Sequence, residues 1–441
     1  MKLILTDGAK LTASKGITVN QGNTLTVYCQ SYGTQMGKLV ATAADDLTYK
    51  YAAIGGLLNA TGTIVIHGGD IKATATEPHI TAIGGAEYFN GGDVSVFDGR
   101  VEARGGSGCP GIGSGWISTI SDSHLAGGTL TVYGGEVYAY GGVSGAGIGG
   151  ASNENGADVT IYGGLIEAQG GENGPGIGCG RYSVDGRNNM SSGTLTVYGG
   201  DVYAYGGKYG AGIGGGLNGC GATVRITGGL VKASGGEKGA GIGSGYIYNN
   251  VDYNSGTLTV SGGEVYAYGG KYGAGIGGGQ DAKGATVHIS GGKVYAYGGS
   301  DAAGVGSGEE SNFFGPNING GTLEVTGGYL YAKGSDMGAG IGGGEDADGA
   351  SVTISGGTVL AYSGGDNGAA AIGSDDHEGH MGTLSITGDL RVYAGNSLPA
   401  LVAFESGSRV IACWSRKYAR IEPCTEHEYD AGVCIWCGHA E

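Results

Sequence analysis

Four residues with metal-binding side chains lie close together near the C-terminus of the sequence. Cys424-x2-His427 is followed by Cys434-x2-Cys437 within the segment CTEHEYDAGVCIWCGH. Two such pairs can place three thiolates and one imidazole tetrahedrally around Zn²⁺. The sequence therefore predicts a Zn²⁺ site at these four residues. Disulfide bonds in an extracellular cap are the alternative interpretation.

Other candidate metal ligands are less specific. His439 or Cys413 could replace one of the four ligands, because only six residues separate the two pairs. The acidic turns at 346–348 and 375–376 offer oxygen ligands that could hold Ca²⁺. Solvated acidic turns without an ion are the commoner explanation for such segments.

Tyrosines recur in pairs separated by one residue. An alternating strand places both members of a pair on one face. An exposed row of rings could bind sugar rings or a flat partner surface. The alternative is structural, with like residues of adjacent strands stacking for ~0.2–1 kcal/mol per pair. The paired candidates for ligand binding are Tyr138 and Tyr140, Tyr203 and Tyr205, Tyr266 and Tyr268, and Tyr295 and Tyr297.

Four insertions add aromatic and acidic residues at one place in the pattern. They span residues 115–127, 181–193, 244–256 and 307–320. Insertions that fall on one side of a repeat protein often form its binding side, although they could equally shield a hydrophobic corner. The further ligand-binding candidates in these loops are Tyr182, Tyr246, Tyr248 and Asp252.

These residues are carried by an internal repeat. A motif close to GAGIGGG recurs, and the spacing between successive copies alternates between short and long units. Each unit contains three short alternating strands that end at Gly pairs, as in 129–133, 137–140 and 145–148. The apolar residue of the motif marks about eleven units, at Ile54, Ile83, Ile112, Ile148, Ile177, Ile213, Ile242, Ile276, Val305, Ile341 and Ile372.

The repeat predicts an all-β fold, a parallel β-solenoid of about eleven three-strand coils. One coil cannot bury its own apolar face, but the coils above and below can cover it. We expect Leu130, Val132, Val137, Ala139 and Ile148 to point inward. The domain prediction is an N-terminal cap over 1–48, Gly-rich repeats over 49–395 and a C-terminal cap over 396–441.

Glycine dominates the outward positions of the third strand. Gly147, Gly212, Gly275 and Gly340 would then leave a flat strip without side chains. Such a strip would permit self-association with a second solenoid or binding of a thin ligand. The simpler interpretation is that only glycine fits a tight coil.

Composition excludes several classes of function. The chain has 104 Gly and only 6 Pro in 441 residues, which does not fit collagen. A formal net charge of −17 gives no electrostatic basis for binding nucleic acid. No apolar run reaches the ~18–20 residues of a membrane span. The first residues, MKLILTD, are too short for the apolar region of a signal peptide.

Units of the form VTISGG-x-V-x-A-x-GG followed by GAGIGGG resemble the Gly-rich repeats of cell-surface proteins from Gram-positive gut bacteria. The terminal HEYDAGVCIWCGH resembles the short Cys-rich modules that end such proteins. The resemblance covers about residues 50–395 and 424–439. It implies a right-handed parallel β-helix, often loosely described as carbohydrate-binding, at an extracellular or cell-surface location. No wall anchor is visible in the sequence.

The first hypothesis is therefore a non-enzymatic, adhesin-like surface or secreted protein that binds glycan or a host or partner surface. A polysaccharide lyase or hydrolase is an alternative, which a group of carboxylates beside an Arg in a groove would favour. A purely structural spacer or fibre segment is the third hypothesis. No nucleophile motif or nucleotide-binding loop supports another chemistry.

Overall fold

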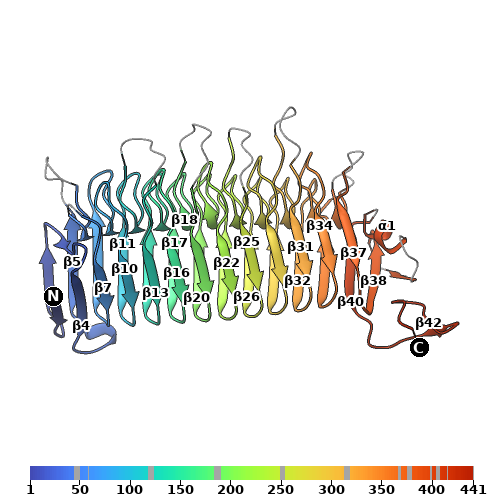
Figure 1. The fold of residues 1–441 in the computed structure, drawn as a ribbon, viewed down its shortest axis with the longest axis horizontal. Coiled ribbons are helices and arrows are strands. Elements are labelled where there is room, and N and C mark those ends of the chain that lie inside the picture. Colours follow the sequence, from blue (N-terminus) through green and yellow to red (C-terminus); the bar gives the residue numbers. More distant parts are fainter. Residues whose placement is uncertain are drawn as a thin grey trace.

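The computed structural model describes residues 1–43, 50–57, 59–117, 124–182, 190–248, 254–311, 318–365, 369–374, 380–397, 400–403, 408–414 and 416–440. The chain winds into an elongated body in which three long sheets run side by side along the axis (Figure 1). The two termini lie at opposite ends of that axis (Figure 1). The predicted ligand-binding residue Asp252 lies outside the described residues, as do parts of all four insertions.

Sheet A has 13 strands in the described part of the chain, and each is the first strand of a coil. Its strands are β1 (Lys2–Leu5), β4 (Thr24–Cys29), β7 (Thr63–Ile66), β10 (Asp93–Val96), β13 (Thr129–Val132), β16 (Asp158–Ile161), β19 (Thr194–Val197), β22 (Thr223–Ile226), β25 (Thr257–Val260), β28 (Thr286–Ile289), β31 (Thr322–Val325), β34 (Ser351–Ile354) and β37 (Thr383–Ile386).

Sheet B has 15 described strands and carries the predicted tyrosine pairs. Its strands, in spatial order, are β2 (Lys10–Ala13), β5 (Lys38–Ala43), β8 (Asp70–Ala75), β11 (Arg100–Arg104), β14 (Glu136–Tyr140), β17 (Leu165–Gln169), β20 (Asp201–Tyr205), β23 (Leu230–Ser234), β26 (Glu264–Tyr268), β29 (Lys293–Tyr297), β32 (Tyr329–Lys333), β35 (Thr358–Tyr362), β40 (Tyr418–Pro423), β38 (Leu390–Gly395) and β39 (Ala400–Val402).

Sheet C has 12 short described strands, built on the Ile-Gly dipeptide of the repeat motif. Its strands are β3 (Ile17–Thr18), β6 (Ile54–Gly55), β9 (Ile83–Gly84), β12 (Ile112–Gly113), β15 (Ile148–Gly149), β18 (Ile177–Cys179), β21 (Ile213–Gly215), β24 (Ile242–Gly243), β27 (Ile276–Gly277), β30 (Val305–Gly306), β33 (Ile341–Gly342) and β36 (Ile372–Gly373).

The remaining described elements are short. A 3₁₀ turn, η1 (Gly33–Gln35), follows β4, and one α-helix, α1 (Ser408–Trp414), lies near the C-terminus. β41 (Tyr429–Asp430) and β42 (Val433–Cys434) form an antiparallel pair beyond the last coil. Within the described residues, no helix has both the length and the apolar character needed to cross a bilayer.

The parallel β-solenoid predicted from the repeat is confirmed. Neighbouring coils pair in parallel with like residues in register, so that Val101, Val137 and Ile166 lie one above another. The predicted inward positions, from Leu130 to Ile148, are buried in one continuous core. The period-two alternation therefore gave the correct face at every strand of this coil.

The number of coils is about twelve, one more than the repeats of the sequence indicate. The additional coil comes from the segment predicted to be an N-terminal cap, since β1, β2 and β3 pair in parallel with β4, β5 and β6. At the other end the sheet changes direction, because β40 inserts antiparallel between β35 and β38. The last part of sheet B is thus closed by antiparallel strands and α1.

The predicted glycine strip is wrong, because these glycines are not at the surface. Gly147, Gly212, Gly275 and Gly340 are all buried. A Cβ on Gly275 would lie 2.6 Å from the backbone nitrogen of Tyr297, a distance that real Cβ atoms do not show. Glycine is needed here because backbone of the next coil occupies the space of a side chain.

Candidate functional site

The four predicted metal ligands come together at the C-terminal end. Their ligand atoms all lie within 4.8 Å of one another. The sulfurs of Cys424 and Cys434 are 4.0 Å apart, and Nδ1 of His427 lies 3.7 Å from Cys424 Sγ and 3.4 Å from Cys437 Sγ. A tetrahedral zinc ion with these ligands needs S···S of about 3.8 Å and S···N of about 3.5 Å. The cluster could therefore hold a metal, and its sulfurs are too far apart for disulfides.

The alternative ligands considered from the sequence lie elsewhere. His439 makes a 2.9 Å contact to Asp389 Oδ2 instead. Cys413 is a buried core residue on α1, outside the cluster. Among the described residues, no other group of His, Cys, Asp and Glu meets the geometry of a metal site, and the turn at 375–379 lies outside them.

The cluster is tied to the last strand of the solenoid. Arg391 of β38 donates from Nε to Cys424 Sγ at 3.3 Å, and the backbone N–H of Cys424 donates to the Asp389 carbonyl at 2.8 Å. Burial raises the pKa of Cys434, but backbone N–H groups of Trp436 and Cys437 outweigh it and lower that pKa, whereas burial raises the pKa of the neighbouring Cys437. The lowered pKa of Cys434 favours the thiolate, which is the form that binds metal.

The predicted tyrosine pairs form two rows on the outer face of sheet B. The row nearest the middle of the strands contains Tyr203, Tyr266 and Tyr295, and the last-position row contains Tyr205, Tyr268 and Tyr297. In the first row, Tyr266 and Tyr295 are stacked with centroids 4.7 Å apart. In the second, Tyr268 and Tyr297 stack at 5.1 Å with planes within 8°. Neighbouring rings therefore cover one another's faces along the axis.

Cations cover several other rings of the two rows. Arg100 and Arg104 lie over Tyr138 and Tyr140 at 4.6 and 3.9 Å. Lys232 takes the place of a tyrosine in the first row and lies 5.7 and 5.5 Å from the Tyr203 and Tyr266 ring centres. The structural interpretation thus applies to these rings, whose faces are covered by neighbouring side chains.

The tyrosines predicted to bind ligand from the insertion loops differ in their exposure. Tyr182 is only 2% exposed and packs with Cys179, Met190 and Ile247, so its predicted role as a surface ligand-binding residue is corrected. The sequence suggested exposure because Tyr182 lies in a polar insertion, but the chain folds this residue back over the coil. Tyr248 is 68% exposed, and Tyr246 lies beneath the Lys238 ammonium at 4.1 Å.

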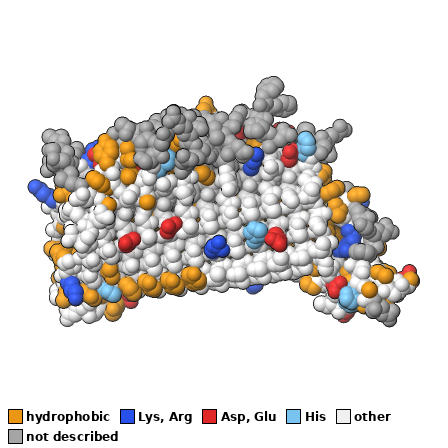
Figure 2. All heavy atoms as spheres, in the orientation of Figure 1, with side chains coloured by type: hydrophobic (Ala, Val, Ile, Leu, Met, Phe, Trp, Pro, Cys, Tyr) orange, Lys and Arg blue, Asp and Glu red, His pale blue; other side chains and the backbone are white. Residues whose placement is uncertain are grey.

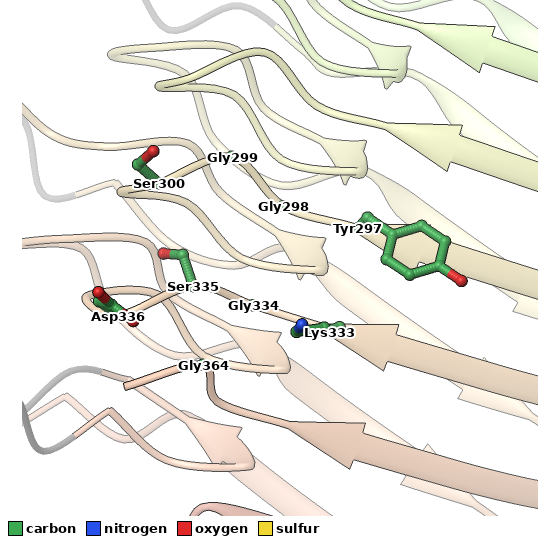
Figure 3. A pocket seen from close by; sticks show the side chains of 9 residues that line it. All are labelled: Tyr297, Gly298, Gly299, Ser300, Lys333, Gly334, Ser335, Asp336 and Gly364. Atoms are coloured by element: carbon green, nitrogen blue, oxygen red, sulfur yellow. The ribbon is translucent and has the colours of Figure 1, made fainter. Parts of the chain in front are cut away.

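A pocket of about 480 Å³ lies where Lys333 follows Tyr297 in the last-position row. Figure 3 shows Tyr297 and Lys333 on one side of it and Ser300, Ser335 and Asp336 on the turns at the other side. Its remaining lining residues, Gly298, Gly299, Gly334 and Gly364, have no side chains to fill it. The Lys333 ammonium makes no ion pair with any described residue.

Nine segments match the family described as the Beta helix repeat. They are residues 94–116, 130–152, 159–181, 195–217, 224–246, 258–280, 287–309, 317–345 and 352–376. The chain is a beta helix repeat protein. No curated protein and no solved structure matches it.

Charged residues cluster at the other end of sheet B in this beta helix repeat protein. Glu102 is 8% exposed and contacts Arg104, Lys72 and Arg100 at 2.8, 3.2 and 3.3 Å. Burial raises the pKa of Glu102, but hydrogen bonds from Arg104 and Lys72 outweigh it and lower the pKa to about 2. This carboxylate stays ionised at neutral pH and suits a structural role better than proton transfer.

A groove of about 740 Å³ lies beside this cluster. Its lining includes the carboxylates of Asp70, Asp98 and Glu136 together with Lys38 and Arg100. Arg100 lies 3.9 Å from Asp70 and 3.8 Å from Glu136, so these charges largely pair with each other. Although burial opposes the charge, nearby carboxylates raise the pKa of Arg100, which makes it a poor proton acceptor.

One aromatic row was missed from the sequence. Rings at the C-terminal ends of the sheet A strands stack over six consecutive coils, with centroids 4.6–5.1 Å apart. Figure 2 shows a row of hydrophobic side chains along the lower edge of the molecule. In five of the six coils the sequence signal was a ring-bearing residue directly before a Gly-Gly or Asp-Gly turn. The members are Tyr28, His67, Phe97, Tyr133, Tyr162 and Tyr198.

Proposed function

We propose that this protein is a non-enzymatic, adhesin-like β-helix that binds glycan along the last-position row of sheet B. The observation that carries the proposal is the pocket beside Tyr297 and Lys333 in that row. It combines an aromatic ring (Tyr297), an ammonium that no described residue pairs with (Lys333), hydroxyls and a carboxylate (Asp336) above bare glycine backbone. A sugar has apolar ring faces and a polar rim, and these groups complement both.

The face is shallow and repeats along the axis. Binding is therefore expected to be weak at each coil and to gain strength from several coils engaging one chain. An extracellular or cell-surface location fits this role and forms part of the proposal. The acidic charge of the chain favours glycan over nucleic acid as the partner.

A glycan array followed by titration calorimetry tests this function. Tyr297→Ala and Lys333→Ala should each weaken binding of the best array ligand. Tyr162→Ala is the matched control, since it removes an exposed stacked ring from the other aromatic row. Equal weakening by all three variants, or no binding by the wild type, would contradict the proposal.

Polysaccharide cleavage is the second candidate, because the 740 Å³ groove holds three carboxylates beside Arg100. If this candidate holds, the purified protein will release oligosaccharides from a polymer, and Glu136→Gln will reduce that release. Binding without product release would leave the non-enzymatic function as the better account.

We further propose that the metal of the Cys₃His cluster is a structural Zn²⁺. All four protein ligands are present and the cluster is largely buried, as in closed structural zinc sites. The ion would hold the C-terminal module in its fold.

A further inference from the structure

The last-position row of sheet B is interrupted at Ser234, where a small side chain takes the place of a ring. Strand pairing places Tyr205, Ser234 and Tyr268 in the same position of three successive coils, followed by Tyr297. Adjacent strands of a sheet are about 4.8 Å apart, so Tyr205 and Tyr268 lie two coils, or about 9–10 Å, apart. Only the small Ser234 side chain lies between them.

One face of the Tyr268 ring is stacked against another tyrosine, and the opposite face is not covered by any described ring or cation. Tyr297 stacks on its C-terminal face with planes within 8°, which fixes the orientation of the ring. No described aromatic ring or cation covers the opposite face, which is directed toward Ser234. Tyr205 and Tyr268 are both 39% exposed, whereas the other paired tyrosines of β20, β26 and β29 are less exposed.

The neighbouring row shows that such a gap accepts a group. There Lys232 lies between Tyr203 and Tyr266, with its ammonium 5.7 and 5.5 Å from the two ring centres. Lys232 and Ser234 belong to the same strand, β23, so the filled gap and the unfilled gap lie side by side. Lys232, which fills the gap in the neighbouring row, therefore places a cation on the same strand as Ser234.

We propose that the gap above Ser234 is a binding slot for one pyranose ring of a glycan, sandwiched between Tyr205 and Tyr268. A ring in the slot would lie about 5 Å from each tyrosine, which is the spacing of stacked rings along this row. The inference rests on the proposed glycan-binding function and names the subsite.

The rim of the slot favours a sugar over a purely aromatic group. Ser234 offers a hydroxyl, and Lys232 on the same strand carries an ammonium. The Glu237 carboxylate in the following turn pairs with Lys208 at 3.9 Å. The Ser234 hydroxyl can pair with a sugar hydroxyl, whereas an apolar aromatic ring would leave it without a partner in the slot.

Replacing Ser234 by tyrosine, the residue at this position in the coils on either side, tests the slot. Ser234→Tyr should complete the stack between Tyr205 and Tyr268, keep the fold, and weaken glycan binding at least tenfold. Thr227→Tyr is the matched control, because it adds the same side chain to the same coil, next to Tyr198 of the other aromatic row. It should leave the affinity unchanged. Tyr268→Ala should also weaken binding, by removing one wall.

The probes are hexasaccharides of glucose, xylose and galacturonic acid and a tryptophan-containing peptide, each measured by calorimetry and by saturation-transfer NMR. Loss of sugar binding in Ser234→Tyr, together with unchanged binding in Thr227→Tyr, supports the slot. Undiminished sugar binding in Ser234→Tyr overturns the slot but leaves the proposed function standing. A wild type that binds none of the sugars overturns both. Binding of the peptide in place of the sugars would assign the slot to an aromatic side chain and overturn the inference.

Discussion

The tyrosine rings on the outer face of sheet B differ in how much of each ring face is covered. Rings that are stacked on both sides, or covered by Arg, have no free face for a sugar. Tyr268 and Tyr297 differ because each borders an unfilled place, the Ser234 gap or the pocket at Lys333. The residues that we propose to bind glycan therefore lie where the regular row of rings is interrupted.

A substitution in the core tests the packing at this scale. Ala204 is fully buried, with Ala168 and Ala233 stacked below and above it. Ala204→Leu should overpack the slim interior and lower stability by about 1–3 kcal/mol. The melting temperature measures the change, and Thr196→Leu on the outer face of sheet A is the control. An unchanged melting temperature for Ala204→Leu would mean that the interior has spare volume.

Glu102 should make the stability of the folded protein depend on pH in the acidic range. Its folded pKa is about 2, below its ordinary value of 4.5, so its stabilising effect is complete above about pH 4.5 and is lost as the pH falls towards 2. Glu102→Gln should cost about 1–3 kcal/mol at pH 7, allowing for solvent screening of its partners. The cost should vanish near pH 2.

Urea titrations of wild type and variant at both pH values measure this difference. Glu167→Gln, on the same face two strands along, is the control. An equal difference in stability at pH 7 and pH 2 would show that charge is not the source of the effect.

The C-terminal module and the solenoid should differ in how strongly their folded structure depends on the proposed Zn²⁺. The module of β41 and β42 lies beyond the last coil, whereas the solenoid core is continuous without it (Figure 1). Removing Zn²⁺, or replacing Cys434 by Ser, should therefore loosen the C-terminal module and leave the coils intact.

Metal analysis should find one Zn²⁺ per chain in the wild type and in Cys29→Ser, the control, and almost none in Cys434→Ser. Hydrogen exchange should then rise in residues 424–440 but not in the strands of sheets A and B. A fall in protection throughout the solenoid would mean that the module is required for the whole fold.

The whole molecule should tolerate the removal of coils in pairs. Each coil contacts its neighbours, so stability is approximately a sum over coils and interfaces. Deleting residues 194–256 removes two coils and joins Gly193 to Thr257, the same position of the repeat. The shortened protein should fold, lose about 9–10 Å of length, and bind glycan more weakly, because Tyr205 and Ser234 are gone while the pocket at Lys333 remains.

Deletion of residues 129–193 provides the comparison, because it also removes two coils but keeps the Ser234 gap and the pocket. Circular dichroism and small-angle scattering measure fold and length, and calorimetry measures binding. Equal loss of binding in both deletions would indicate that overall length, rather than these coils, determines affinity.

The sequence by itself determined the solenoid, its three strands per coil and the inward face. In a strand, alternation of Leu, Val and Ala with polar residues places the apolar side chains on one face. The Gly pairs mark the turns between strands. It also identified the four metal ligands, because their spacing is local. These features depend on neighbours in the chain, which a sequence shows directly.

Only the tertiary structure decided which residues are accessible. It buried Tyr182 and the glycines of the third strand, because a folded-back loop and the backbone of the next coil cover them. The place of Ser234 between Tyr205 and Tyr268, by contrast, already follows from the repeat, and the strand pairing confirms it. Accessibility is set by contacts between coils, and those contacts exist only once the chain has wound.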